Sequence, residues 1–394
     1  AKSKSDMARA EYEKRPWLKW YPKGCPADVE IPVKSIVEYF DEAVEKWGNK
    51  TAVIFYGKKL TYKELRESSL RFATALHDLG IRKGDMVAIL VPNSPQFMIA
   101  YFGILRLGAV VTTLSPLYTP REIVHQLKDS GAKTVICLDL LCEKVEKASE
   151  EVALNHVIVT SIEEYLPSAG RFFGKLRGKT LSVEVHKKSG FFQFQELINK
   201  YPPNPPKVEI NPKEDIAALP YTGGTTGVPK GTMLTHYNII SLVEEIRPYW
   251  PEVEDGKEVG LIVLPLYHIY GQSVIMLNGI LRGQTGILFP KPDLEDMLNA
   301  VEKYGVTLWY GVPTLYNYLV DHPRTKRVNW KKLKFCICGA DTLHETTRED
   351  WRKWTGVDIF EGYGLTETSG VTNANPPDRN KVGSFGVPLP NTYI

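Results

Sequence analysis

The sequence predicts an α/β protein in which two doubly wound, mostly parallel sheet subdomains pack together. Short apolar runs alternate with helical patterns from residue 86 onward, as expected for parallel strands covered by helices on both faces. The alternation starts again after residue 215, and 394 residues exceed what one compact core usually supports. We therefore predict a first subdomain over 1–205, a second over 206–370, and the start of a small β-rich subdomain over 371–394.

The first half contains a helix whose start can be placed. Thr61 and Glu64 have the spacing of a capping box, and apolar residues then repeat at helical intervals to give one buried face. The apolar stretch 97–114 contains Arg106 and two glycines, so it predicts a helix and a buried strand, not a membrane span. The strands predicted in this half are 86–91, 109–112, 134–138 and 156–159.

The second half repeats the pattern of alternating strands and helices. Its predicted strands are 216–220, 259–265, 286–289, 307–310, 333–337 and 357–360. The intervening segment 161–212 is less regular and ends in the proline-rich run 202–206, so we predict an insertion that connects the two units. Basic residues between Arg171 and Lys188 predict a solvated loop face, and contact with a membrane surface is the alternative.

Composition excludes several classes of protein. Hydrophobic content of 43% with 24% charged residues is ordinary for a globular protein, and a net charge of +3 indicates no nucleic-acid partner. Residues 1–15 lack the apolar core of a secretory signal, so we expect a cytoplasmic location. The five cysteines are scattered, and Cys336 and Cys338 fall on one face of a predicted strand, which favours buried free thiols over a metal pair.

The segment from Tyr221 to Gly231 is rich in glycine and threonine and follows a predicted strand. Glycines let backbone N–H groups turn inward, threonines add hydroxyl donors, and a lysine adds a cation, which together suit a polyphosphate. Val228 and Pro229 separate the lysine from the preceding glycine, so this is not a Walker A loop. The residues expected to bind phosphate are Thr222, Gly223, Gly224, Thr225, Thr226, Gly227 and Lys230.

The segment Glu361 to Gly370 carries a second signal. Tyr363 lies between two glycines, where an aromatic face and nearby backbone suit stacking on adenine. Thr366 and Glu367 offer a hydroxyl and a carboxylate for phosphate and Mg²⁺. A strand-to-helix turn is the structural alternative, but the two segments occur together, which favours one nucleotide site.

The segment Tyr221 to Gly231 closely resembles the phosphate loop of the adenylate-forming superfamily, which includes acyl-CoA synthetases, luciferases and adenylation domains of peptide synthetases. Gly223 stands where that family usually has serine, which removes one hydroxyl from the expected site. Segments 265–271, 338–341 and 361–370 also resemble family segments, in the family's order.

The resemblance implies roles for these residues. Thr222, Lys230, His268 and Glu367 are expected in catalysis, with Thr226 and Glu367 near Mg²⁺. The acyl group is expected beside His268, Tyr310, Gly311 and Gly339. The further nucleotide-binding residues that it implies are Gly339, Ala340, Asp341, Glu361, Gly362, Tyr363, Gly364 and Thr366.

The implied reaction is ATP-dependent activation of a carboxylic acid to an acyl-adenylate, followed by thioester formation with coenzyme A. Segments 17–22 and 309–314 look most like fatty acyl-CoA synthetases of the medium- to long-chain type, so a fatty acid is the expected substrate. The alternatives are an aryl-CoA ligase, a carrier-protein adenylation domain, and a nucleotide- or acyl-binding fragment without turnover. Related proteins continue past the position of Ile394 into a small C-terminal domain with a catalytic lysine. We therefore expect this chain, which lacks that domain, to bind ATP but adenylate slowly.

Overall fold

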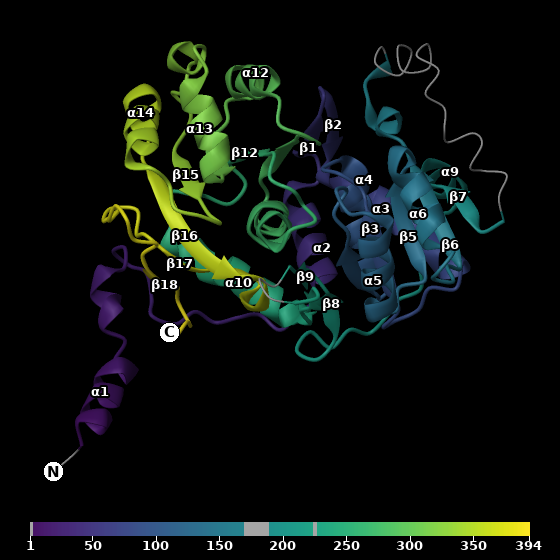
Figure 1. Ribbon diagram of the computed structural model, residues 1–394, viewed down its shortest axis with the longest axis horizontal. Helices are drawn as coiled ribbons and strands as arrows, with labels where there is room; N and C mark the ends of the chain where they lie inside the picture. Colours follow the sequence, from purple (N-terminus) through teal and green to yellow (C-terminus); the bar gives the residue numbers. More distant parts are fainter. Residues whose placement is uncertain (1–2, 169–188, 224–226) are drawn as a thin grey trace.

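The computed structural model describes residues 3–168, 189–223 and 227–394. Gly224, Thr225 and Thr226 of the predicted phosphate loop, and the basic residues of 171–188, lie outside these ranges. The molecule has two lobes, each built on a sheet with helices on both faces (Figure 1). The predicted α/β class with two doubly wound, mostly parallel sheets is confirmed.

The first lobe contains a seven-stranded sheet in the order β11-β8-β4-β3-β5-β6-β7, parallel except for β11. Its strands are β3 (Met86–Leu90), β4 (Val110–Thr113), β5 (Thr134–Leu138), β6 (His156–Thr160), β7 (Phe191–Gln193), β8 (Ile216–Ala218) and β11 (Leu234–Thr235). Its helices are α3 (Tyr62–Asp78), α4 (Pro95–Arg106), α5 (Pro120–Ser130), α6 (Cys142–Ala148) and α9 (Phe194–Lys200), with short η2 (Asp139–Leu141) and η3 (Ile162–Tyr165). Successive residues of β3 face opposite sides: Val87 packs in the cluster with α3 and α4, and Ala88 in the cluster with α5 and α6.

The second lobe contains a nine-stranded sheet in the order β18-β17-β16-β15-β14-β12-β13-β1-β2. Its strands are β1 (Thr51–Phe55), β2 (Lys58–Thr61), β12 (Val259–Ile262), β13 (Thr285–Leu288), β14 (Leu308–Gly311), β15 (Phe335–Cys338), β16 (Ile359–Leu365), β17 (Gly370–Ala374) and β18 (Val387–Pro388). The run from β1 to β16 is parallel, and β2, β17 and β18 pair antiparallel at the two edges.

Helices cover both faces of the second sheet. One side is covered by α12 (Leu294–Tyr304), α13 (Pro313–Asp321) and α14 (Glu345–Thr355), where Cys336 and Cys338 are buried as free thiols, as predicted. The other side is covered by α2 (Ile36–Trp47), α10 (His236–Tyr249), the π-helical η4 (Tyr270–Leu277) and α11 (Asn278–Leu281). The remaining elements are α1 (Lys4–Glu13), η1 (Pro16–Trp20), η5 (Thr325–Arg327), η6 (Thr366–Thr368) and the hairpin β9 (Tyr221–Thr222) and β10 (Lys230–Gly231).

Each sheet contains strands from both sides of the expected boundary at residue 205. β1 and β2 come from the first 205 residues but join the nine-stranded sheet, with Val53 of β1 opposite Gly286 of β13. β8 and β11 come from beyond residue 206 but extend the seven-stranded sheet. The division of the chain at residue 205 therefore does not coincide with the division into sheets.

Local predictions from sequence hold for most elements. The Thr61 and Glu64 capping box is present, and 97–114 contains most of α4 followed by β4. The strand predicted at 357–360 begins at Ile359 and continues to Leu365, because Gly362 to Leu365 pair with β17. Over the ranges described, no helix has the length and apolar character needed to cross a bilayer.

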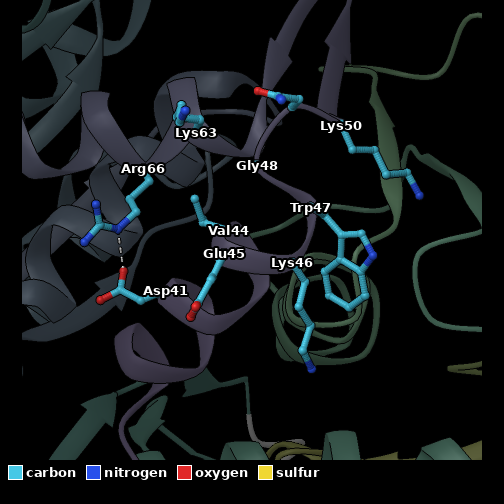
Figure 2. A pocket seen from close by; sticks show the side chains of 10 residues that line it. Asp41, Val44, Glu45, Lys46, Trp47, Gly48, Lys50, Lys63 and Arg66 are labelled. Carbon is cyan, nitrogen blue, oxygen red and sulfur yellow. Dashed lines mark hydrogen bonds and ion pairs between the residues drawn. The ribbon is translucent and has the colours of Figure 1, made fainter.

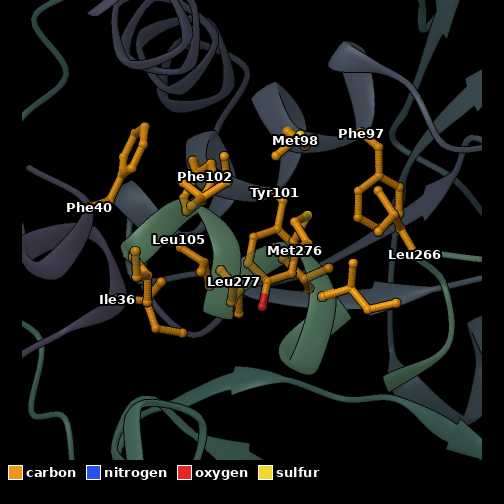
Figure 3. Packing of buried hydrophobic residues seen from close by; sticks show 14 of the residues in the cluster. Ile36, Phe40, Phe97, Met98, Tyr101, Phe102, Leu105, Leu266, Met276 and Leu277 are labelled. Carbon is orange, nitrogen blue, oxygen red and sulfur yellow. The ribbon is translucent and has the colours of Figure 1, made fainter. Parts of the chain in front are cut away.

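The lobes share one apolar core where α2, α4 and η4 meet (Figure 3). Phe40 of α2 stacks on Phe102 of α4, with ring centroids 4.2 Å apart. Met276 and Leu277 of η4 reach the same cluster, and all four side chains are fully buried. This continuous packing fixes the relative position of the two sheets, and with it the edges that form the site.

Candidate functional site

A cavity of about 470 Å³ brings residues from the predicted motifs together at the carboxyl ends of strands of the second sheet. Its volume lies within the range of about 300–1,000 Å³ that is typical of small-molecule sites. Binding at the carboxyl ends of strands is the general rule for open α/β sheets. The residues that line it are Thr222, Gly223, His268, Ile269, Tyr270, Ile337, Gly339, Ala340, Gly362, Tyr363, Gly364, Leu365, Thr366, Glu367, Gly370 and Val371.

The first wall is the base of the β9–β10 hairpin. Thr222 pairs with Lys230 across the hairpin, and its hydroxyl donates to the Lys230 carbonyl at 3.5 Å. Tyr221 donates its hydroxyl to Asp129 of α5 at 2.6 Å, so the hairpin is tied to the first lobe. Thr222 and Gly223 line the cavity, whereas Gly227 and Lys230 do not, although Lys230 extends an exposed cation from the same hairpin.

The second wall is formed by β16, η6 and β17, which together make up the predicted 361–370 segment. A Cβ at Gly364 would lie 1.9 Å from the Gly370 carbonyl oxygen, so this close approach of strands requires glycine. Tyr363 lines the cavity with 42% of its side chain exposed. Glu367 of η6 is also exposed on this wall. An aromatic face and a free carboxylate are thus presented from one edge of the sheet.

The third wall is the loop after β15. Gly339 donates its N–H to the Gly311 carbonyl at 3.1 Å, and a Cβ at Gly339 would lie 2.7 Å from the Tyr270 ring. Ala340 adopts a left-handed backbone conformation with φ of 77°, which is uncommon for residues other than glycine. Gly339 and Ala340 therefore place only small groups on this part of the lining.

Several predicted site residues lie outside the lining. Glu361 accepts a hydrogen bond from the Leu343 N–H at 3.0 Å and so holds the loop after β15. Asp341 accepts from the Thr342 N–H at 2.7 Å. Tyr310 and Gly311 are buried and do not line the cavity: a Cβ at Gly311 would meet the Tyr316 ring, and Tyr310 lines a separate small void between η4 and the sheet. Of these residues, Glu361 and Gly311 hold the loop after β15 through hydrogen bonds, whereas Asp341 accepts a hydrogen bond from the residue next to it.

His268 lies on the wall of the cavity with a defined hydrogen bond. Its Nδ1 accepts from the Tyr270 N–H at 3.2 Å, so in the neutral ring the proton resides on Nε2. The surrounding protein desolvates the ring and lowers its pKa below the usual value for histidine. At neutral pH, the imidazole is therefore an uncharged hydrogen-bond donor.

The residues present fit a magnesium ion held mainly by substrate. Within residues 3–168, 189–223 and 227–394, no group of three or more His, Cys, Asp or Glu side chains could form a metal cage. Mg²⁺ bound with nucleotides commonly uses only one or two carboxylates together with phosphate oxygens and water. Glu367 supplies such a carboxylate and Thr366 a hydroxyl beside it, while Thr226 lies outside the described residues.

Sequence reasoning missed the apolar part of the lining. Ile337 and Val371 are strand residues without a distinguishing pattern, so only the assembled sheet shows that they face the cavity. Tyr270 could have been noticed, because it lies two residues after His268 in a segment already singled out. Its ring is packed over Gly339, and burial raises the pKa of its hydroxyl well above the usual value.

A larger depression of about 710 Å³ lies elsewhere, between α2 and α3, and contains none of the motif residues (Figure 2). Arg66 pairs with Asp41 at 2.7 Å. The Lys50 side chain donates hydrogen bonds from Nζ to the carbonyls of Gly256 and Gly283. Because these charges are engaged with the protein itself, the smaller cavity is the better candidate site.

Comparison with known proteins decides the family. The family model described as AMP-binding enzyme matches residues 40–394. The chain belongs to the AMP-binding enzymes. This match confirms the predicted superfamily. The predicted resemblance to fatty acyl-CoA synthetases is confirmed by relatives that are named long-chain-fatty-acid–CoA ligases.

The relatives are acid–CoA ligases. The long-chain-fatty-acid–CoA ligase of Bacillus subtilis (strain 168) is 36% identical over 381 residues, which cover 96% of this chain and 68% of that protein. The 4-coumarate–CoA ligase 4 of Arabidopsis thaliana is 30% identical over 345 residues, which cover 86% of this chain and 57% of that protein. The crystal structure of a long-chain-fatty-acid–CoA ligase from Archaeoglobus fulgidus superposes with a TM-score of 0.79 at 25% identity, covering 94% of this chain and 71% of that one. The chain thus spans about two thirds of the length of the B. subtilis and A. fulgidus ligases.

Proposed function

We propose that the cavity binds ATP, and that this AMP-binding enzyme activates a medium- or long-chain fatty acid as its acyl-adenylate before transfer to coenzyme A. One observation supports this above all: Thr222 and Gly223 from the first motif line the same cavity as Tyr363 and Glu367 from the second. These two motifs are about 140 residues apart in the sequence. Their convergence is what a site for one nucleotide requires.

The arrangement suits adenylation. Adenine would lie between the Tyr363 ring and the wall of Gly339 and Ala340, with its phosphates toward the β9–β10 hairpin. The carboxylate oxygen of the acid attacks the α-phosphorus, and the bond to pyrophosphate breaks. Hydroxyl and lysine donors near the hairpin would stabilise the charge that develops on pyrophosphate. When bound, Mg²⁺ neutralises phosphate charge, and Glu367 and Thr366 are the described residues that would hold it.

His268 would orient the acid. Because its Nδ1 is occupied by the Tyr270 N–H, Nε2 can donate to a substrate oxygen without adding a positive charge. Its lowered pKa keeps that donor neutral at physiological pH. An oriented oxygen near the α-phosphorus lowers the entropic cost of the first step.

A second cavity adjoins the nucleotide cavity and would give the thiol of coenzyme A a route to the acyl-adenylate. It has a volume of about 440 Å³, and its mainly apolar lining includes Leu117, Tyr318 and the cation Lys291. Tyr267 lines this cavity and the next residue, His268, lines the nucleotide cavity, so one segment separates the two spaces. We propose that coenzyme A enters here and that its thiol attacks the acyl carbonyl near His268, releasing AMP.

Ligand binding tests the proposal without requiring turnover. Thermal unfolding of the chain would be followed with ATP, GTP and a series of non-hydrolysable acyl-sulfamoyl adenosines carrying octanoyl, dodecanoyl, hexadecanoyl or benzoyl groups. A ligand present at 100 times its Kd stabilises the folded state by about 2.7 kcal/mol. We expect the fatty acyl analogues to stabilise most, ATP less and GTP least. Absence of any shift with all the adenylates would refute the proposed site.

Turnover separates two of the alternatives, an aryl-CoA ligase and a binding fragment without turnover. Acid-dependent exchange between ATP and pyrophosphate, measured over the same range of acids, reports adenylation directly. Exchange with benzoate but not with fatty acids would indicate an aryl-CoA ligase. One relative, the 4-coumarate–CoA ligase 4 of Arabidopsis thaliana, is named for an aromatic acid. Binding of adenylates without exchange for any acid would indicate a binding fragment.

A further inference from the structure

A second aromatic ring lies against Tyr363 on β16. Phe385, in the loop before β18, stacks on Tyr363 with ring centroids 4.8 Å apart and an angle of 26° between the ring planes. Tyr363 lines the nucleotide cavity, whereas Phe385 does not. The side chains are 42% and 52% exposed, and neither belongs to the apolar clusters that form the cores. The pair therefore lies outside the apolar cores of the molecule.

The loop that carries Phe385 is held in place by a buried amide. Asn375, only 1% exposed, donates its side-chain N–H to the carbonyl of Ser384 at 2.6 Å. Its side-chain oxygen accepts from the Lys381 N–H at 3.2 Å. The loop is thus tied to the end of β17, the strand that pairs with β16. The position of Phe385 relative to Tyr363 follows from this connection.

A glycine fixes the last turn of the same loop. Gly386 has φ of 84°, and a Cβ there would lie 2.1 Å from the carbonyl carbon of Ala374. Only glycine allows the backbone to pass so close to β17 in a left-handed conformation. Immediately afterwards β18 pairs with β17, with Val387 opposite Ala374. Phe385 is therefore presented from a defined backbone, between a buried amide and a strand.

We propose that Phe385 is a positioning residue for the base of the nucleotide: it holds the Tyr363 ring in the plane in which its other face receives adenine. The proposal rests on the proposed function, because it takes adenine to lie against Tyr363. Stacked rings favour offset contact, and a ring supported on one face loses less freedom when a ligand covers the other. Phe385 acts through Tyr363 and does not contact the ligand itself.

The test compares ATP with a ligand that has phosphates but no base. Isothermal titration calorimetry would measure binding of ATP and of inorganic tripolyphosphate to Phe385→Ala, Phe385→Tyr and Tyr363→Ala. We expect Phe385→Ala to weaken ATP binding about three- to tenfold, given the usual strength of an aromatic pair. Tripolyphosphate binding should stay within twofold of wild type, and Phe385→Tyr should restore ATP binding because it keeps the ring.

A matched control lies in the same loop. Val382 is 44% exposed and has no ring, so Val382→Ala should leave both affinities unchanged. Melting temperatures of all variants should agree within a few degrees, because neither aromatic side chain contributes to a core cluster. In the double variant Tyr363→Ala with Phe385→Ala, the affinity for ATP should match that of Tyr363→Ala alone.

The outcomes distinguish this inference from the proposed function. If Tyr363→Ala weakens ATP binding at least tenfold but Phe385→Ala does not weaken it, the positioning role is overturned and the nucleotide site stands. If Phe385→Ala weakens tripolyphosphate as much as ATP, the loop has a general structural effect and the inference is also overturned. If neither aromatic variant affects ATP, adenine does not lie on Tyr363 and the proposed placement itself fails.

Discussion

At the scale of single residues, the glycines of the site differ in whether the surrounding atoms leave space for a side chain. Gly364 is required by the approach of the Gly370 carbonyl, and Gly339 by the Tyr270 ring. Gly223 is different, since an added Cβ would meet no atom of the described residues within 4 Å. The family usually has serine at that position, so this chain lacks a hydroxyl for which there is space.

Restoring the hydroxyl should strengthen nucleotide binding. We predict that Gly223→Ser tightens ATP binding about two- to tenfold, because one added hydrogen bond contributes about 0.5–1.5 kcal/mol. Gly223→Ala is the control: it fits the same space without a donor and should not tighten binding. Calorimetric titration of both variants with ATP gives the measurement, and equal affinities for the serine and alanine variants would contradict the role of the hydroxyl.

Gly364 gives the opposite case. Gly364→Ala places a Cβ against the Gly370 backbone, so the β16–β17 hairpin must shift. Overpacking of this kind costs about 1–3 kcal/mol, and we predict such a decrease in the free energy of unfolding together with weaker ATP binding. Urea unfolding and ATP titration would measure both. Gly260→Ala is the matched control, because a Cβ added at Gly260 would have no other atom within 4 Å. This variant should change neither the free energy of unfolding nor the affinity for ATP by much.

At the scale of elements, a buried histidine joins two helices from different parts of the chain. His236 at the start of α10 is fully buried, and its Nδ1 accepts from the N–H of Ile36 at the start of α2, at 3.1 Å. Desolvation lowers its pKa to about 4, although the nearby Asp215 carboxylate acts in the opposite direction. The neutral ring is thus part of the contact between the helices.

Stability should fall in mild acid because of this ring. The unfolded chain binds a proton at His236 below about pH 6.5, whereas the folded chain does so only near pH 4. The unfolded state binds more protons in this window, so the free energy of unfolding decreases as pH falls from about 6.5 to 4, by up to about 3 kcal/mol. His236→Gln cannot titrate and should lose less stability than wild type between pH 7 and pH 4.5 in urea unfolding. Equal losses would show that other groups cause the acid sensitivity.

At the scale of the whole molecule, the site exists only because two sheets are held together. The hairpin that contributes Thr222 is anchored to α5 of the first lobe through Asp129, while Tyr363 lies in β16 and Gly339 follows β15 in the second. The apolar core of α2, α4 and η4 lies between the sheets (Figure 3). Packing in that core therefore determines the distance between the two halves of the site.

Substitution of Phe102 tests whether the geometry of the site depends on packing in the shared core. It is fully buried against Phe40, and Phe102→Ala should lower the free energy of unfolding by about 3–5 kcal/mol through lost burial and the resulting cavity. Phe102→Leu keeps most of the volume and should cost much less. Urea unfolding measures the loss, and ATP titration well below the transition should show weaker binding for the alanine variant only. Unchanged ATP affinity at that reduced stability would show that the site does not depend on this core.

Much of the fold and part of the site follow from local sequence. Strands such as Thr134–Leu138 and the capping box at Thr61 are set by apolar runs and short-range hydrogen bonds, so the pattern predicts them directly. The two glycine-rich motifs could also be identified, because their chemistry depends on residue types at fixed spacing. Even so, β1 and β2 were missed among the predicted strands, and the partner of β1 in the sheet, β13, lies more than 200 residues away in the sequence.

The sequence alone determined the α/β class, the family and the residue types that suit a nucleotide, because these depend on periodicity and on motifs within a few residues. Tertiary structure decided the rest. It assigned strands from both halves of the chain to each sheet, placed the Glu361 carboxylate against the Leu343 N–H, and brought Phe385 against Tyr363. These are contacts between distant segments, whose free energy depends on packing geometry that no local pattern contains.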